Sequence, residues 1–373
     1  MFLRTFGASL VIAGIGLVLG FVYGGPTGLA LTAILAILEV SLSFDNAVVN
    51  ATVLVRMSPF WQKIFLTVGV AIAVFGMRLI FPLLIVCLSA QKSPVEAIRL
   101  ALEKGDPNQK GTYGYLLHQA HPTIAAFGGM FLLMLFLDFV FEEREITWLS
   151  WIERPLAKIG KLDQLSVVIA LGTLAIAAYT LGTGADTATH DRTSTVLISG
   201  LLGLATYLLV NGLGEFFDVD EDDEVTDTGE KVKIDKQKVT HVVGKAAFFL
   251  FLYLEVLDAS FSFDGVIGAF AITSDPIIIA IGLGVGAMFI RSLTVFLVRK
   301  GTLGEYVFLE HGALWAIGAL AVILLITIEY AVPEIVTGLV GVAFIGLALL
   351  SSIIRNKREA AGETSNDAEP VSV

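Results

Sequence analysis

An eight-residue peptide that carries two acids occurs twice in the chain, each time inside a long apolar stretch. The copies are residues 38–45, LEVSLSFD, and residues 257–264, LDASFSFD. In each copy an acid, Glu39 or Asp258, is followed six positions later by an aspartate. A carboxylate in the bilayer core raises the free energy of insertion by about 2.5–3.5 kcal/mol. Two such peptides in apolar surroundings therefore indicate that the acids have a function.

The first copy cannot direct all of its polar side chains at one ion while its helix stays straight. Successive residues of an α-helix turn by about 100°. Asp45 therefore lies on a different face from a polar stripe that is formed by Glu39, Ser43, Asn46 and Asn50.

The second copy has the same conflict, because Asp264 lies on a different face from Glu255, Asp258 and Ser262. We predict either that the helix unwinds at the Ser-Phe-Asp segment of each copy, or that each aspartate meets a different neighbour. Gly265 would ease such a break. Unwound helices with free carbonyls commonly bind cations in transporters.

The two copies supply hard oxygen ligands: carboxylates, amides, hydroxyls and backbone carbonyls. These ligands suit Mn²⁺, Mg²⁺ or Ca²⁺, and no thiolate or histidine cluster accompanies them, as zinc or copper would favour. Asp45 and Asp264 together would neutralise one divalent cation. We expect Glu39, Asp258 and Glu255 to support the metal from further out or to carry protons.

The composition predicts an all-α, polytopic membrane protein whose solvent is the lipid bilayer. Of the 373 residues, 55% are hydrophobic and 16% are charged, whereas soluble domains carry about 25% charge. A net charge of −11 without a basic surface argues against nucleic-acid binding. Apolar stretches long enough to span the bilayer predict about ten transmembrane helices, near residues 6–22, 29–55, 64–88, 123–141, 165–181, 195–213, 246–272, 277–298, 308–330 and 335–354.

The basic residues predict the orientation of these helices. If the N-terminus is cytoplasmic and the spans alternate, most of the 24 Lys and Arg residues fall on the cytoplasmic side. This bias predicts that both termini lie in the cytoplasm.

Similarity between the two halves extends beyond the acidic peptide. In the helix after each copy, an arginine follows a glycine by nine positions, as Gly69 and Arg78 and as Gly282 and Arg291. Spans 2–4 and 7–9 therefore form a three-helix repeat. Equivalent helices are five spans apart, and this odd number makes the repeat inverted, as is typical of secondary transporters. We expect both arginines to pair with the acids when no ion is bound; purely structural pairing and snorkelling are the alternatives.

The expected organisation follows from these spans. Ser93, Pro94 and Glu96 predict a capped amphipathic helix in the outside loop. The segments are a first transmembrane helix at 1–25, repeat 1 at 28–141 with an outside loop at 89–121, two connecting helices at 142–213, an acidic and basic cytoplasmic loop at 214–243, repeat 2 at 244–330, a last helix at 331–355 and a disordered tail at 356–373.

Two segments resemble the signatures of a known family. Residues 38–46, LEVSLSFDN, resemble the Glu-x-x-Leu-Ser-x-Asp-Asn signature of the tellurium-resistance TerC family, and residues 261–273, FSFDGVIGAFAIT, resemble its second signature, Phe-x-x-Asp-Ser-Ile-x-Ala-x-Phe-Ala-x-Thr. That family belongs to the LysE exporter superfamily, which is built on inverted three-helix repeats. The chain resembles most closely a bacterial membrane branch catalogued as domain of unknown function 475.

The resemblance implies an inner-membrane metal exporter, with manganese as the substrate best attached to the family. It carries a metal-site role onto Asp45, Asn46 and Asp264 and a supporting role onto Glu39. Gly265 departs from the family pattern, because it stands where a serine is usual. A hydroxyl ligand is then missing unless another residue replaces it.

We therefore expect a divalent cation transporter that exports Mn²⁺, with exchange for protons as one coupling scheme. The metal candidates are Asp45, Asn46, Asp264, Glu39 and Asp258, and the supporting residues are Glu255, Ser43, Ser262, Asn50, Arg78 and Arg291. The sequence contains no nucleophile–base pair of the kind that would indicate an enzyme. We expect no tightly bound cofactor, and a homo-oligomer is compatible with the sequence. Two rivals stay open: a non-transporting membrane partner in a tellurite or metal stress-response assembly, and an exporter of a cationic organic solute.

Overall fold

The computed structural model describes residues 2–366, apart from positions 70, 104, 107, 145, 163, 183–191, 223–241, 274 and 301–305. Every regular element in this part is a helix, and the only strand-like feature there is an isolated bridge between Met57 and Val242. The all-α class expected from the sequence is confirmed.

Seven helices are long and apolar enough to cross a membrane, which indicates a multi-pass membrane protein. A shorter apolar helix, α8, spans Leu165–Thr180, and α10 spans Gly244–Ile272 with its acids along its length. The seven segments are Thr5–Val40, Pro59–Leu88, Tyr113–Phe141, Thr193–Leu213, Pro276–Val298, Leu309–Ile326 and Val336–Arg358.

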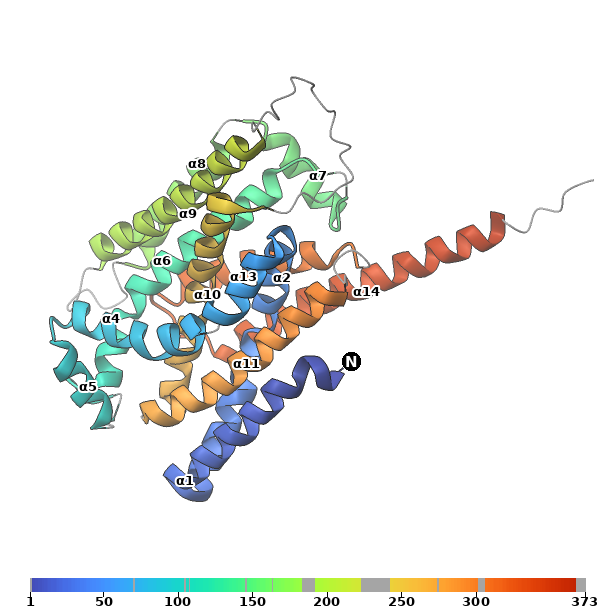
Figure 1. Ribbon diagram of the computed structural model, residues 1–373. Helices are drawn as coiled ribbons and strands as arrows, with labels where there is room; N and C mark the ends of the chain where they lie inside the picture. The colour runs from blue at the N-terminus through green and yellow to red at the C-terminus, as the bar shows by residue number, and fades with distance from the viewer. Residues whose placement is uncertain are drawn as a thin grey trace, which may run out of the picture.

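Helix α1 (Phe2–Leu42) is a hairpin of two limbs, as Figure 1 shows at its lower end. The chain reverses at Gly25, whose φ of 62° lies in the left-handed region that glycine adopts without strain. Pro26 starts the second limb, where its missing N–H needs no helical partner. The expected boundary between the first helix and repeat 1 therefore falls inside α1.

The acidic peptide of the first copy interrupts its helix, and that of the second copy does not. Helix α1 ends at Leu42, Ser43 has φ −100° and ψ 15°, and α2 runs over Phe44–Arg56. In contrast, α10 continues through Ser262 and its neighbours. Helical hydrogen bonds continue on both sides of Ser43, from the Ser43 N–H to the Glu39 carbonyl oxygen at 2.9 Å and from the Ala47 N–H to the Ser43 carbonyl oxygen at 3.2 Å. The expected unwinding at Ser-Phe-Asp is therefore limited to a kink at Ser43 in the first copy. It is wrong for the second copy, where an unbroken helix keeps backbone groups in an apolar environment hydrogen-bonded.

The helix that follows each copy also differs between the halves. In the first half it is divided into α3 (Pro59–Ile64), two π-helical segments η1 (Phe65–Gly69) and η2 (Ile72–Ile80), and α4 (Phe81–Ser89). In the second half it is one regular helix, α11 (Pro276–Lys300). Segments of π-helix inside α-helices occur frequently at functional sites.

The remaining helices correct two expectations about the cytoplasmic segments. Helix α9 (Thr193–Asp222) extends into the expected loop 214–243, and α14 (Glu334–Asn366) extends into the expected disordered tail 356–373. The Arg-, Lys-, Glu- and Ala-rich sequence after residue 354 has high helix propensity, which explains the extension of α14 that projects from the bundle in Figure 1. Residues 223–241 and 367–373 lie outside the described residues.

Residues 89–121, the expected outside loop, contain α5 (Pro94–Leu102). The Ser93 hydroxyl accepts a hydrogen bond from the Glu96 N–H at 3.2 Å, which confirms the predicted cap. The segment leads into α6 (Tyr113–Phe141). Helix α7 (Ser150–Ile159) precedes α8, and α13 (Leu309–Ile326) precedes α14.

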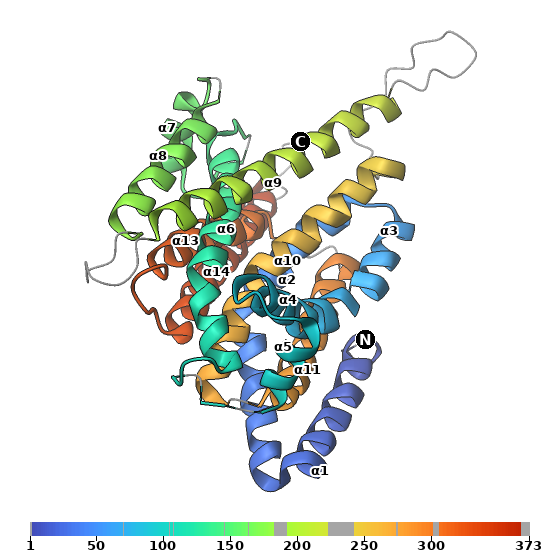
Figure 2. The ribbon, with the colours of Figure 1, turned by 90° about the vertical axis from the view of Figure 1, so that its left-hand side faces the viewer.

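The packing pairs of helices repeat between the two halves. Helix α11 packs against α1 and α2, and η2 packs against α10. Likewise α2 packs against α13, and α10 packs against α6, while α6 and α13 pack against each other at the centre. Figures 1 and 2 show α10 and α11 threading through the middle of the bundle, so that the acidic peptides lie among buried helices.

Candidate functional site

The two acidic peptides lie side by side and run in opposite directions. The Asn46 side-chain amide donates a hydrogen bond to the Asp258 carboxylate at 2.6 Å. At the other end, a Cβ added to Gly265 would lie 3.1 Å from Oε2 of Glu39. Residue numbers rise along one peptide while they fall along the other, so α10 is antiparallel to the α1–α2 segment.

Glu39 is buried, and one of its carboxylate oxygens, Oε1, binds both Arg78 and Ser43. Its side chain is 1% exposed and forms an ion pair with Arg78, whose second guanidinium nitrogen donates to the carbonyl oxygen of Ala73. The Ser43 hydroxyl donates to Oε1 of Glu39 at 2.9 Å. Charge and hydrogen bonds thus compensate the burial of this carboxylate.

Asp258 pairs with the equivalent arginine of the second half. A nitrogen of Arg291 lies 3.8 Å from Oδ2 of Asp258, and the same nitrogen donates to the Gly69 carbonyl oxygen at 3.2 Å. The guanidinium carbon lies 3.9 Å from the centre of the Phe65 ring, a cation–π arrangement. The expected pairing of both arginines with acids is confirmed for Glu39 and Asp258.

Gly265 makes room for a longer acid. It occupies the position in its copy that Asn46 occupies in the first, and it faces Glu39 as Asn46 faces Asp258. Glutamate is one methylene longer than aspartate, so the smaller residue lies opposite the longer acid. A side chain at position 265 would share its space with the end of the Glu39 side chain.

Several buried polar side chains of the site have no hydrogen-bond partner among the described residues. Both carboxylate oxygens of Glu255, both amide atoms of Asn50 and the hydroxyl of Ser262 are in this state. Glu255 is 6% exposed and Asn50 is 1% exposed. Orphaned polar atoms at this depth indicate a missing ligand or a second conformation.

The two aspartates predicted to bind metal are located only through their backbones. Asp45 lies in the first turn of α2 and Asp264 lies within α10, and their side chains are outside the described part of the structure. Among the side chains that are described, no three of the His, Cys, Asp and Glu residues form a group that could hold a metal ion.

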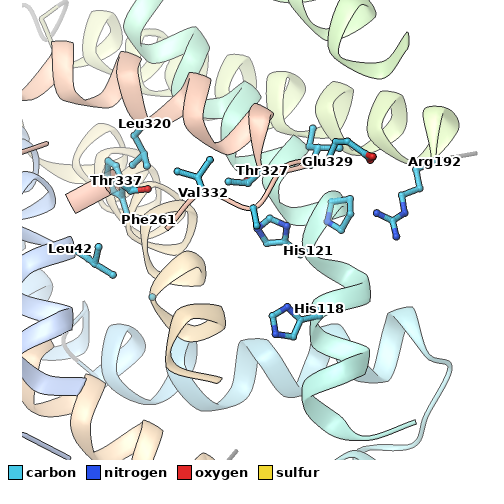
Figure 3. A pocket seen from close by; sticks show the side chains of 14 residues that line it. Leu42, His118, His121, Arg192, Phe261, Leu320, Thr327, Glu329, Val332 and Thr337 are labelled. Carbon is cyan, nitrogen blue, oxygen red and sulfur yellow. The ribbon is translucent and has the colours of Figure 1, made fainter. Parts of the chain in front are cut away.

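A cavity of about 310 Å³ reaches the acidic peptides from one end of the bundle. We call it the His118 cavity. Figure 3 shows His118 and His121 on α6, with Glu329 and Arg192 nearby and Phe261 deeper in the bundle. Its lining also includes Leu42 and Gly265, which come from the two peptides.

A cavity of about 570 Å³ opens at the opposite end, and we call it the Asp138 cavity. The Tyr207 hydroxyl donates to the Asp138 carboxylate at 2.8 Å, and the lining includes Val49 and Tyr253 from α2 and α10. Arg56 also lines this cavity, and its carbonyl oxygen accepts a hydrogen bond from the Val242 N–H at 2.8 Å.

The sequence did not reveal a buried acid outside the repeated peptides. Glu153 on α7 is 5% exposed; it accepts a hydrogen bond from the Trp315 indole at 2.9 Å and lies 3.3 Å from the His311 ring nitrogen. Burial alone would raise the pKa of Glu153, but the hydrogen bonds from His311, Trp315 and the Leu149 N–H lower it overall. The only signal in the sequence is His311, which lies near the start of an apolar helix and needs a polar partner there.

Comparison with known proteins identifies one family. A family model described as "Protein of unknown function (DUF475)" matches residues 44–359. No curated protein and no solved structure matches the chain.

Proposed function

Because the chain belongs to the DUF475 family of unknown function, we propose a function from its own intramembrane site: a transporter that exports a divalent metal cation, foremost Mn²⁺, across the bacterial cytoplasmic membrane. The metal binds between the two acidic peptides, with Asp45 and Asp264 as its carboxylate ligands. The finer affiliation with the TerC family and the LysE superfamily is part of this proposal and rests on the two signature segments.

The observation that carries the proposal is the crossing of the two peptides. The Asn46 amide of the first copy contacts Asp258 of the second, and Gly265 of the second copy, which has no side chain, faces Glu39 of the first. A duplication that survived without a shared site would not need to keep the acid of each copy against the other copy. The buried ion pairs support the same reading, since isolated charges in a membrane are expensive.

An inverted repeat with ten spans accounts for the packing. Exchange of α1–α2 with α10, of η2 with α11 and of α6 with α13 converts the packing of α11 on α1 and α2 into that of η2 on α10. It also converts the packing of α2 on α13 into that of α10 on α6, and it leaves the contact between α6 and α13 unchanged. Division of α1 at Gly25, together with α8 and α10, raises the seven apolar segments to ten. An inverted repeat places its binding site near the midplane at the repeat interface.

The two cavities support passage across the membrane. Residues expected in the cytoplasm, such as Arg56 and Arg144, line the Asp138 cavity, whereas His118 and Arg192, expected outside, line the His118 cavity. Both termini are then cytoplasmic. The acidic peptides separate the two cavities, as a site with alternating access requires.

The roles of the other acids follow from their partners. Arg78 neutralises Glu39 and Arg291 neutralises Asp258, so these acids set the position of the peptides and approach the metal only when the arginines move away. Asn46 offers an amide oxygen beside Asp45. Hard oxygen ligands of this kind suit Mn²⁺.

Everted membrane vesicles that contain the protein test this function. Wild-type vesicles should accumulate Mn²⁺, and Asp45→Asn and Asp264→Asn should each abolish accumulation, whereas Glu103→Gln, which changes an exposed acid on the α5 side, should not. Mn²⁺ accumulation that survives both changes overturns the site. Accumulation of a cationic amino acid instead of Mn²⁺ would favour an organic substrate.

A further inference from the structure

The second half of the molecule contains one acid more than the first. Glu255 has Ala36 as its equivalent, because both lie three residues before the paired acid of their copy, Asp258 or Glu39. In the first half one acid has one arginine. In the second half Arg291 alone faces two acids, Asp258 and Glu255, so one negative charge is left without a positive partner.

Glu255 is packed against backbone. A Cβ added to Gly69 would lie 2.6 Å from Oε1 of Glu255, so the carboxylate fills the space above this glycine. The carbonyl oxygen of Gly69 is already hydrogen-bonded to Arg291. Neither Glu255 oxygen has a hydrogen-bond partner among the described residues. A buried carboxylate in this state is unfavourable by several kcal/mol unless a positive charge joins it.

Asn50 lies at the same level of the bundle. The contact between Asn46 and Asp258 fixes the register of the antiparallel helices. One helical turn further, α2 presents Asn50, and one turn back, α10 presents Glu255. Both amide atoms of Asn50 are buried without a partner among the described residues, and its equivalent in the second copy is Ala269. The repeat therefore relates this polar pair, which takes one residue from each half, to the apolar pair Ala36 and Ala269.

We propose that Glu255 and Asn50 form a site for one monovalent cation, H⁺ or Na⁺, separate from the divalent site. One positive charge restores the balance of the second half, and carboxylate and amide oxygens are ligands of the right kind. Val49 and Tyr253, neighbours of the pair in sequence, line the Asp138 cavity, so this cavity comes close to the buried pair without reaching it. That this cation is the coupling ion of metal export rests on the proposed function; that the site exists does not.

Equilibrium binding to the full-length protein in detergent, without divalent metal, tests the site. In one arm Na⁺ replaces choline at constant ionic strength and the midpoint of thermal unfolding is followed, since a ligand that binds only the folded state raises it. In the other arm, in Na⁺-free buffer, a pH step is followed by infrared difference spectroscopy of the protonated carboxyl stretch. The variants are Glu255→Gln and Asn50→Ala, with Glu103→Gln as the control.

The wild type and Glu103→Gln should show one of the two responses: a higher midpoint of thermal unfolding in Na⁺, or a protonated-carboxyl band after the pH step. Glu255→Gln should abolish a carboxyl band or weaken Na⁺ binding by more than about tenfold, and Asn50→Ala should weaken the same response. A wild type silent in both arms, or a Glu255→Gln variant that responds like the wild type, overturns the proposal. Because neither arm uses Mn²⁺ or flux, these results are separate from failure of the vesicle assay.

Discussion

Asn46 and Gly265 occupy equivalent positions in the two acidic peptides, and each lies against the acid of the opposite peptide. The amide of Asn46 is 2.6 Å from the Asp258 carboxylate, and Gly265 leaves its side-chain space to Glu39. The two contacts differ in chemistry but conserve volume, because a large residue meets the short acid and a small residue meets the long one. Packing of one acidic peptide on the other therefore couples positions that are far apart in the sequence.

This trade of volume predicts compensation between two substitutions. Gly265→Asn should lower the free energy of unfolding by about 1–3 kcal/mol, because its side chain would displace Glu39 from Arg78. Addition of Glu39→Asp should restore at least half of the loss, since it rebuilds the Asn–Asp contact of the other half. Thermal unfolding in detergent measures both. A double variant at least as unstable as the sum of the single variants would contradict the compensation.

The Glu39–Arg78 ion pair should be important for stability because it is buried. Glu39→Ala leaves the Arg78 guanidinium in an apolar core and should lower the free energy of unfolding by about 3–5 kcal/mol. The exposed Lys92–Glu96 pair is the matched control, and Glu96→Ala should change stability by less than about 1 kcal/mol. If the two substitutions lowered the midpoint of thermal unfolding equally, the Glu39–Arg78 pair would not have the importance for stability that its burial predicts.

Two glycines of the divided span should differ in their tolerance of a methyl group. A Cβ at Gly69 would lie 2.6 Å from the Glu255 carboxylate, whereas a Cβ at Gly76 would meet nothing closer than 3.4 Å, on the flexible Ile72 side chain. Gly69→Ala should therefore destabilise the protein by about 1–3 kcal/mol. Gly76→Ala should be neutral or stabilising, because alanine favours helix. The unfolding midpoints of the two variants, compared side by side, decide the matter.

Acid should weaken the attachment of α7 to α13. The pKa of Glu153 is lower in the folded protein than in the unfolded chain, so its contribution to stability is present above the ordinary carboxyl pKa. That contribution is lost as the pH falls through the folded pKa, below about pH 4. Glu153→Gln should be less stable than the wild type at pH 7, and the difference should shrink toward pH 3. A constant difference across this range would exclude Glu153 as its cause.

The sequence predicted the parts of the site that follow from charge in an apolar environment. The repeated peptides, their helices and the pairing of Arg78 and Arg291 with acids all result from the need to neutralise buried charge. The break at Ser43 was predicted because a straight helix cannot collect its polar residues on one side.

The remaining features depend on contacts that a single sequence does not encode locally. The continuity of α10 at Ser262 and the function of Gly265 arise from the packing of one half on the other. The burial of Glu153 results from the docking of an amphipathic helix on a distant span. The polar composition of residues 356–373 predicted a disordered tail, whereas the helix propensity of the residues after 354 favours the extension of α14 that is observed.

Anomalous diffraction from crystals soaked in Mn²⁺ is the most direct test of the central claim. We predict one strong peak between the two acidic peptides, within bonding distance of carboxylate oxygens from both Asp45 and Asp264, and its loss in Asp264→Asn. Manganese bound only in the His118 or Asp138 cavity, or an unchanged peak in the variant, would contradict a metal site shared by the two halves.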